Sequence, residues 1–284
     1  MTIATNLMNQ LDNANVLFNV SEELLTTSSG IVIPNKKALI NTQSGKVMGI
    51  VSNQYRTVSN QEIFETFTKE IEQSDLNTDD VQVKVKFHKN GAKTLVDFIF
   101  PNETIEVNGD KTALSITALN SFDGSTRYVT KAGGFRMKCA NGQVLGKVAG
   151  SYTSLHNPKL DVQKGAERVM KMVQEFQNAQ EYWDTLLERN LDGEVVDAVI
   201  MQFLGLDPNA DEDIFRKPNV SKVYNLWSQY KKELGNNAFA LYNVFTDFIT
   251  HGKYKEGSEA HALLRNQSKL ETLMATNDVF NTAH

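Results

Sequence analysis

The first 160 residues alternate between apolar and polar positions in short runs, a pattern typical of β-strands. The clearest run is VQVKVKFHK at residues 81–89, where valines and a phenylalanine face one way while Lys84, Lys86 and His88 face the other. A helix is expected near residues 59–74, because Ser59 and Glu62 fit a capping box ahead of an apolar stripe. The remaining predicted strands are 30–34, 38–40, 46–52, 93–100, 113–119 and 126–131.

After residue 160 the apolar positions follow the spacing of helices instead. One long helix is expected from 161 to 190, followed by shorter helices at 193–205, 221–234, 238–252 and 257–280, with a loop at 207–219. The fold class is therefore α+β, an antiparallel β-rich N-terminal half followed by a helical C-terminal half. Residues 1–160 form the sheet region and 161–284 a helical region packed on or beside it, as one continuous domain or two.

The stretch GGFRMKCANGQVLGKV, residues 133–148, holds the only cysteine of the chain. Asn141-Gly142 predicts a two-residue type I′ hairpin turn. Alternation then puts Arg136 and Lys138 on one face and Cys139 on the other, beside Phe135. A buried structural thiol is the simpler interpretation of Cys139, because no histidine is spaced to act as its base.

Composition excludes several classes of protein. One cysteine in 284 residues leaves no intramolecular disulfide and no multi-cysteine zinc site. No apolar run reaches the length of a membrane span, and the first 20 residues carry no basic residue, so we expect a cytoplasmic protein, in the host cell if it is phage-encoded. Nucleotide-binding glycine motifs, Gly-x-Ser-x-Gly and His-Glu-x-x-His are all absent from the sequence, so neither a cofactor, a metal nor an enzymatic activity is expected.

Charge is distributed unevenly. Residues 81–160 hold 11 basic against 5 acidic residues, a net of +6, whereas residues 161–284 hold 13 against 19, a net of −6. Strand-face cations with aromatic residues such as Phe122 and Tyr128 nearby can follow a nucleic-acid backbone and stack its bases. The alternative is a plain solvated sheet face, where lysine is common. The candidate nucleic-acid-binding residues are Lys84, Lys86, Arg127, Lys131, Arg136 and Lys138.

Three segments together resemble the phage- and plasmid-related family known as domain of unknown function 932. The central one, 120–144, carries Asn120, Asp123, Gly124, Phe135, Arg136, Cys139, Asn141 and Gly142. The early one is GIVSNQYRTVSNQEIFE at 49–65, and the late one, 237–252, carries Leu241, Tyr242, Asn243, Thr246, Asp247 and His251. The resemblance implies a mobile-element origin and an intracellular protein, and it brings no catalytic residues with it.

Polar residues of the late segment recur every four positions. Asn243, Asp247 and His251 therefore share one helix face and, with Arg136, are candidates for a polar binding or conformational site. The alternative interpretation is that they are structural, as helix caps and interhelical hydrogen bonds.

The leading functional hypothesis is a non-enzymatic phage or plasmid protein that binds nucleic acid, with single-stranded DNA as the expected partner, in replication, recombination or annealing. Homo-oligomers are expected to suit such a role, and no membrane partner is expected. The alternative is a protein-interaction module, such as an inhibitor of host defence that uses the acidic half. Residues 1–25 are expected either to form an arm for subunit exchange or to pack on the body.

Overall fold

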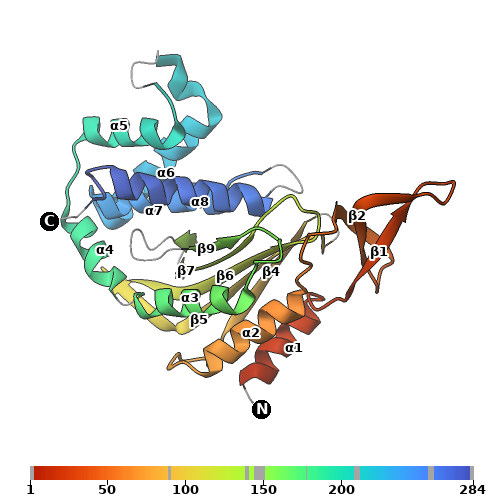
Figure 1. Cartoon of the computed structure of the whole chain (residues 1–284). Coiled ribbons are helices and arrows are strands. Elements are labelled where there is room, and N and C mark those ends of the chain that lie inside the picture. Colours follow the sequence, from red (N-terminus) through yellow and green to blue (C-terminus); the bar gives the residue numbers. More distant parts are fainter. Residues whose placement is uncertain are drawn as a thin grey trace.

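The computed structural model describes residues 3–88, 91–137, 141–143, 151–176, 178–207, 212–254 and 259–281. Figure 1 shows a main β-sheet between two helical layers, with a small second sheet projecting to one side. Helices α1, α2 and α3 cover one face of the main sheet, and α7 and α8 lie over the other, with α5 and α6 adjoining them. This is the α+β arrangement expected from the sequence, with antiparallel sheets in the N-terminal half and helices in the C-terminal half.

The main sheet is antiparallel throughout, in the order β4-β5-β6-β7-β8, and β9 also pairs with β7. Its strands are β4 Gln82–His88, β5 Lys93–Val107, β6 Asp110–Ser121, β7 Tyr128–Arg136, β8 Asn141–Gln143 and β9 Ser151–Ser154. Strands β5 and β6 are both longer than the predicted strands 93–100 and 113–119. They meet at a tight turn formed by Asn108-Gly109, whose φ angles are both positive, at 50° and 74°.

The small sheet has the order β1-β2-β3, with β1 Val20–Thr26, β2 Val32–Asn41 and β3 Lys46–Ser52. Residues 30–34 and 38–40, predicted as separate strands, belong largely to the single strand β2. Pro34 is tolerated in this central strand because its pairing with β1 is irregular there and its pairing with β3 begins only at Lys36.

The helices largely follow the apolar periodicity. They are α1 Ile3–Asn13, α2 Asn60–Glu72, α3 Val162–Gln174, α4 Ala179–Glu188, α5 Gly193–Leu204, α6 Pro218–Leu234, α7 Ala238–Thr250 and α8 Glu259–Thr276, with a short 3₁₀ helix at Glu212–Arg216. The predicted cap of α2 is confirmed, since the Ser59 hydroxyl accepts a hydrogen bond from the Glu62 amide at 2.9 Å. Gly205 ends α5 in the left-handed conformation.

Two predictions made from local sequence are wrong. The single helix expected over 161–190 is two helices, α3 and α4, because the chain turns after Gln174 and the helix resumes at Ala179. Asn141-Gly142 is not the hairpin turn: Asn141 pairs with Arg136 and Gly142 with Phe135, so the connection is residues 137–140. Register set by the neighbouring strands outweighed the turn propensity of the Asn-Gly pair.

The N-terminal segment packs on the body. Leu7, Leu11 and Val16 are buried in the main core beside α2. The amide side chain of Gln10 bonds the free edge of β4 at both the Val81 carbonyl and the Val83 amide, at 3.1 and 3.3 Å. Helix α1 therefore covers part of an edge strand that would otherwise be open to other chains. Among the described helices, none is both long and apolar enough to cross a membrane.

Candidate nucleic-acid interface

Lys84 of β4 and Lys131 of β7 lie on the same side of the main sheet. Cross-strand pairing aligns Lys84 with Asp97, Asp97 with Thr117, and Thr117 with Lys131. Directly paired residues of a sheet project to the same side, so these four form one polar row across four strands. We call the side of the sheet that carries this row the lysine face.

The lysine face is not open along its whole length. Leu263 and Leu264 of α8 pack on Leu95 and Leu119, which lie on this face. The ammonium group of Lys131 is buried under α8 and donates a hydrogen bond to the side-chain carbonyl of Gln267. The expectation of a fully exposed basic face is therefore wrong at Lys131, whereas it holds at the edge strand, where Lys84 and Lys86 are exposed.

Between α8 and the lysine face lie two hollows of about 640 and 240 Å³, which share Lys131 and Leu264 as lining residues. We call them together the α8 groove. The smaller hollow is lined by Lys84, Lys86, Asp97 and Thr117 from the sheet and by Thr250, His251 and Gln267 from the helices, among others. The larger is lined by Tyr55, by residues 124–127 and 155–157, and by Arg265, Ser268 and Glu271 of α8, among others.

Cations outnumber acids among the described residues of the α8 groove. Its basic residues are Lys84, Lys86, Arg127, Lys131 and Arg265, against the acidic Asp97 and Glu271. The charge therefore favours an anionic ligand. Four of the six residues predicted to bind nucleic acid, Lys84, Lys86, Arg127 and Lys131, are brought together here.

Burial shifts the titration of the central polar row. Burial raises the pKa of Asp97, although Thr117 donates a hydrogen bond to it at 2.6 Å and the nearby lysines oppose the rise. Burial lowers the pKa of Lys131, against the attraction of Glu271 and Asp97. Burial likewise raises the pKa of Glu271. Each of these shifts favours the neutral form of its group. A negatively charged ligand beside Lys131 would therefore stabilise the charged form of this lysine.

Two aromatic rings form one end of the larger hollow. The rings of Tyr55 and His156 stack with centroids 4.7 Å apart and planes 9° from parallel. Burial lowers the pKa of His156 to about 4, so the ring is neutral at pH 7. Its Nδ1 lies 3.3 Å from the backbone carbonyl oxygen of Arg56. Because a carbonyl oxygen can only accept a hydrogen bond, Nδ1 carries the single N–H proton of the neutral ring. Nε2 of His156 is buried and has no hydrogen-bond partner within the described chain.

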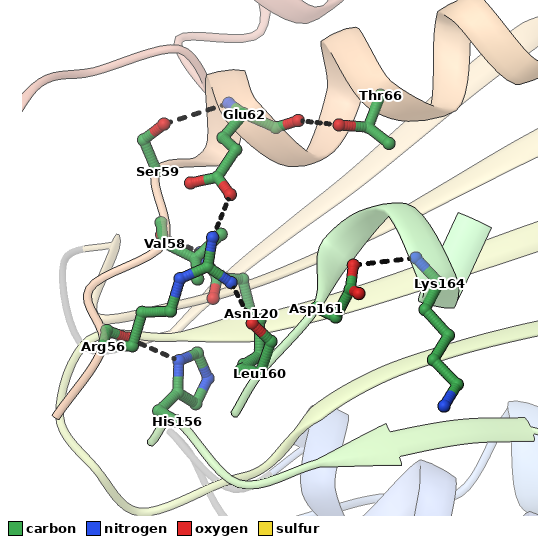
Figure 2. Close-up of polar contacts among 10 residues, drawn as sticks. All are labelled: Arg56, Val58, Ser59, Glu62, Thr66, Asn120, His156, Leu160, Asp161 and Lys164. Atoms are coloured by element: carbon green, nitrogen blue, oxygen red, sulfur yellow. Dashed lines mark hydrogen bonds and ion pairs between the residues drawn. The ribbon is translucent and has the colours of Figure 1, made fainter. Parts of the chain in front are cut away.

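Figure 2 shows how this end of the groove is held to the rest of the molecule. Arg56 donates to a carboxylate oxygen of Glu62 on α2 at 2.7 Å and to the carbonyl oxygen of Leu160, and its amide bonds the carbonyl of His156 at 3.2 Å. The contacts join segments about 100 residues apart. Asp161 then caps α3 by accepting from the Lys164 amide at 3.0 Å.

The early segment and the first half of the central segment singled out in the sequence meet here. Asn120 donates to the Val58 carbonyl at 3.0 Å and to the Asn60 side chain at 2.8 Å, with both asparagines buried. Gly49 is required by close packing: a Cβ atom there would lie 2.5 Å from the Asp123 backbone. These residues are structural and set the position of the loop 121–127 that lines the groove.

Arg136 does not belong to the proposed surface. Its side chain is fully buried on the sheet side opposite Lys131, paired with Asp110 and, at 2.6 Å, with Glu233 of α6. Its guanidinium carbon lies 5.2 Å from the centroid of the Tyr230 ring. The prediction that Arg136 is exposed is therefore wrong, because acidic partners distant in sequence neutralise it within the core. Lys138 and Cys139 lie outside the described residues.

The polar residues of α7 do not assemble one site. Asn243 is buried and donates to the Phe239 carbonyl of its own helix at 2.9 Å. Asp247 accepts from the Tyr230 hydroxyl at 2.9 Å, which links it indirectly to Arg136. His251 ends the helix, is exposed and lines the smaller hollow of the groove.

Sequence reasoning missed Tyr55, His156 and Arg265 as groove residues. Tyr55 lies in the early segment already quoted, which was a usable signal, whereas His156 and Arg265 stand in no motif. Only the folding of α8 over the sheet brings Arg265 near Arg127. Within the ranges described above, no three His, Cys, Asp or Glu side chains gather closely enough to hold a metal ion.

Comparison with known proteins gives one match. Residues 47–276 match the family described as Domain of unknown function (DUF932). No curated protein and no solved structure matches the chain. The matched range contains all three segments that suggested this family from the sequence. Because the match covers most of the chain, this protein belongs to the DUF932 family.

Proposed function

We propose that this protein binds single-stranded nucleic acid, with DNA as the expected form, along the α8 groove. The observation that carries the proposal is the line of cations from Lys84 and Lys86 at the sheet edge, past Lys131, to Arg127 and Arg265. Most contacts between proteins and nucleic acids go to phosphate oxygens, and lysine and arginine are the usual donors. The whole protein carries a net charge of −5, so the excess of cations in the α8 groove does not simply reflect its overall composition.

Size favours a single strand over a duplex. The larger hollow, of about 640 Å³, is in the range of small-molecule pockets and can take one or a few nucleotides, and the smaller, of about 240 Å³, lies just below that range. At one end the half-buried ring of Tyr55, which stacks on the buried ring of His156, lines the larger hollow as an aromatic residue of the kind on which bases stack in single-strand-binding proteins.

The proposed context is a phage or plasmid protein that acts in replication, recombination or annealing, in the cytoplasm of the host cell. It rests on the mobile-element character of the proteins that the chain resembles and on a groove whose cations suit a phosphate backbone.

Fluorescence anisotropy with labelled single-stranded and double-stranded oligonucleotides tests the proposal. Paired substitutions Lys84→Glu with Lys86→Glu, and Arg127→Glu with Arg265→Glu, should each weaken single-strand binding by about tenfold or more, since each reverses two charges beside the phosphates. The matched control is Lys164→Glu with Lys171→Glu on exposed positions of α3, across the sheet from the groove.

The control should bind nearly as the unmodified protein does. Equal weakening in all three variants would mean that binding follows net charge rather than the groove. No binding to any oligonucleotide at low salt would remove this function and leave the protein-interaction alternative as the leading one.

A further inference from the structure

The small sheet exposes an unusual share of apolar side chains. Of the ten large hydrophobic side chains that are exposed among the described residues, five lie in or beside β1, β2 and β3: Leu24, Ile31, Val32, Val47 and Ile50. They do not all share one face: Leu24 pairs with Lys37 and projects to the same side as Leu39, whereas Val47 and Ile50 project to the opposite side.

The two faces of this sheet differ. The inner face packs on the body, through Leu39 and Val51 against Phe18 and Phe122. On the outer face, Ile40 pairs with Val47, and Ile50 lies in the next row, opposite Ala38. Val47 and Ile50 are 60% and 53% exposed. A sheet that is apolar on both faces is stable when each face is covered, and the outer face has no covering element within the described chain.

The outer face also carries one charge of each sign. Glu23 pairs with Ala38, and Lys36 lies two residues before Ala38, so both project to the same side as Ile50. Both are exposed, and neither forms an ion pair within the described part of the chain. An apolar centre bordered by one acid and one base is self-complementary, as the interface of a symmetric dimer must be.

We propose that the outer face of the small sheet binds the same face of a second copy of this chain. A two-fold axis that runs diagonally across the sheet through Ala38 and Val47 brings Ile40 of each copy to Ile50 of the other. This packs two three-stranded sheets face to face, the arrangement by which β-sheets commonly bury apolar side chains.

The same axis places Glu23 of each copy opposite Lys36 of the other. Glu23 and Lys36 lie in adjacent strands and adjacent rows, symmetrically on the two sides of the diagonal. Two ion pairs therefore lie beyond Ala38 at one end of the apolar centre, one on each side of the axis. The proposal is independent of nucleic-acid binding, because the outer face contains none of the groove residues.

The size of the outer face sets the expected affinity of the dimer. A standard protein interface uses about 20 to 30 residues on each side. The outer face offers fewer, so the dimer should be weak, with a Kd on the order of 10 to 100 µM.

Sedimentation velocity across a concentration series up to several hundred micromolar tests the proposal, with nucleic acid absent. The unmodified chain should shift from monomer to dimer, and Val47→Glu combined with Ile50→Glu should remain monomeric throughout. The matched control replaces two exposed apolar residues elsewhere, Val195→Glu with Phe215→Glu, and should dimerise normally. Circular dichroism checks that each variant is folded.

A mixing experiment tests the symmetry itself. Glu23→Lys and Lys36→Glu should each abolish dimers, because each leaves like charges facing across the axis, and an equimolar mixture of the two variants should restore them as heterodimers. A chain that stays monomeric at every concentration would overturn the proposal. Dimers that persist in the Val47→Glu and Ile50→Glu variant would also overturn it, because they would show that another surface holds the copies together.

Discussion

At the residue scale, Arg136 is a core residue whose charge is neutralised within the molecule. Replacing it with leucine should lower the free energy of unfolding by about 3 to 5 kcal/mol, because Asp110 would remain buried without its cation. Urea denaturation measures the change, and Arg127→Leu, at an exposed position, should shift stability by no more than about 0.5 kcal/mol. Equal stability of the two variants would contradict the buried ion pairs.

His156 should make stability depend on pH. Burial lowers its pKa from 6.5 to about 4, so between these values the unfolded chain takes up a proton that the folded chain excludes. The free energy of unfolding contributed by this group is present above pH 6.5 and falls as the pH falls. Between pH 7 and 5 the loss should be about 2 kcal/mol.

The comparison that isolates this effect is urea denaturation of the unmodified chain and His156→Asn at both pH values. The variant lacks the titrating ring, so it should lose about 2 kcal/mol less stability than the unmodified chain on the same change of pH. Parallel losses in the two proteins would show that His156 titrates normally in the folded state.

At the element scale, the position of the loop 121–127 depends on β3. Gly49→Ala puts a methyl group 2.5 Å from the Asp123 backbone, so either β3 or the loop must move. We expect a loss of about 1 to 3 kcal/mol of stability on urea denaturation. Gly193→Ala, where nothing lies within 4 Å of the added atom, should be neutral or slightly stabilising. A Gly49→Ala variant as stable as Gly193→Ala would refute the close packing.

The helices and strands were predicted well where the apolar residues of a segment clearly followed the spacing of one type of element. The alternation of residues 81–89 correctly placed Lys84 and Lys86 on one face, and Ser59 with Glu62 correctly marked the start of α2. Prediction failed where distant residues decided the outcome. Asn141-Gly142 has the composition of a turn, yet pairing with Phe135 and Arg136 makes it a strand.

The candidate site was predictable only in part, for the same reason. Lys84, Lys86, Arg127 and Lys131 were identified from charge and alternation, and they do meet in the groove. The burial of Arg136 depends on Asp110 and Glu233, which are 26 and 97 residues away, and no local pattern reveals such partners.

At the scale of the whole molecule, two helical layers give the faces of the main sheet different roles. Helices α1 to α3 bury one face in the core, whereas α8 covers the other incompletely and leaves the α8 groove. The small sheet projects beyond both layers. The groove and the projecting sheet are therefore separate surfaces, and one molecule can use both at once.

The salt dependence of single-strand binding tests the central claim most directly. For single strands, the slope of log affinity against log salt is about −0.7 for each phosphate neutralised, so five groove cations predict a slope of about −3.5. Combining Lys84→Glu with Lys86→Glu should reduce the magnitude of the slope by about 1.4. A slope that is unchanged in this variant, while binding persists, would place the nucleic acid elsewhere on the molecule and contradict the proposed role of the α8 groove.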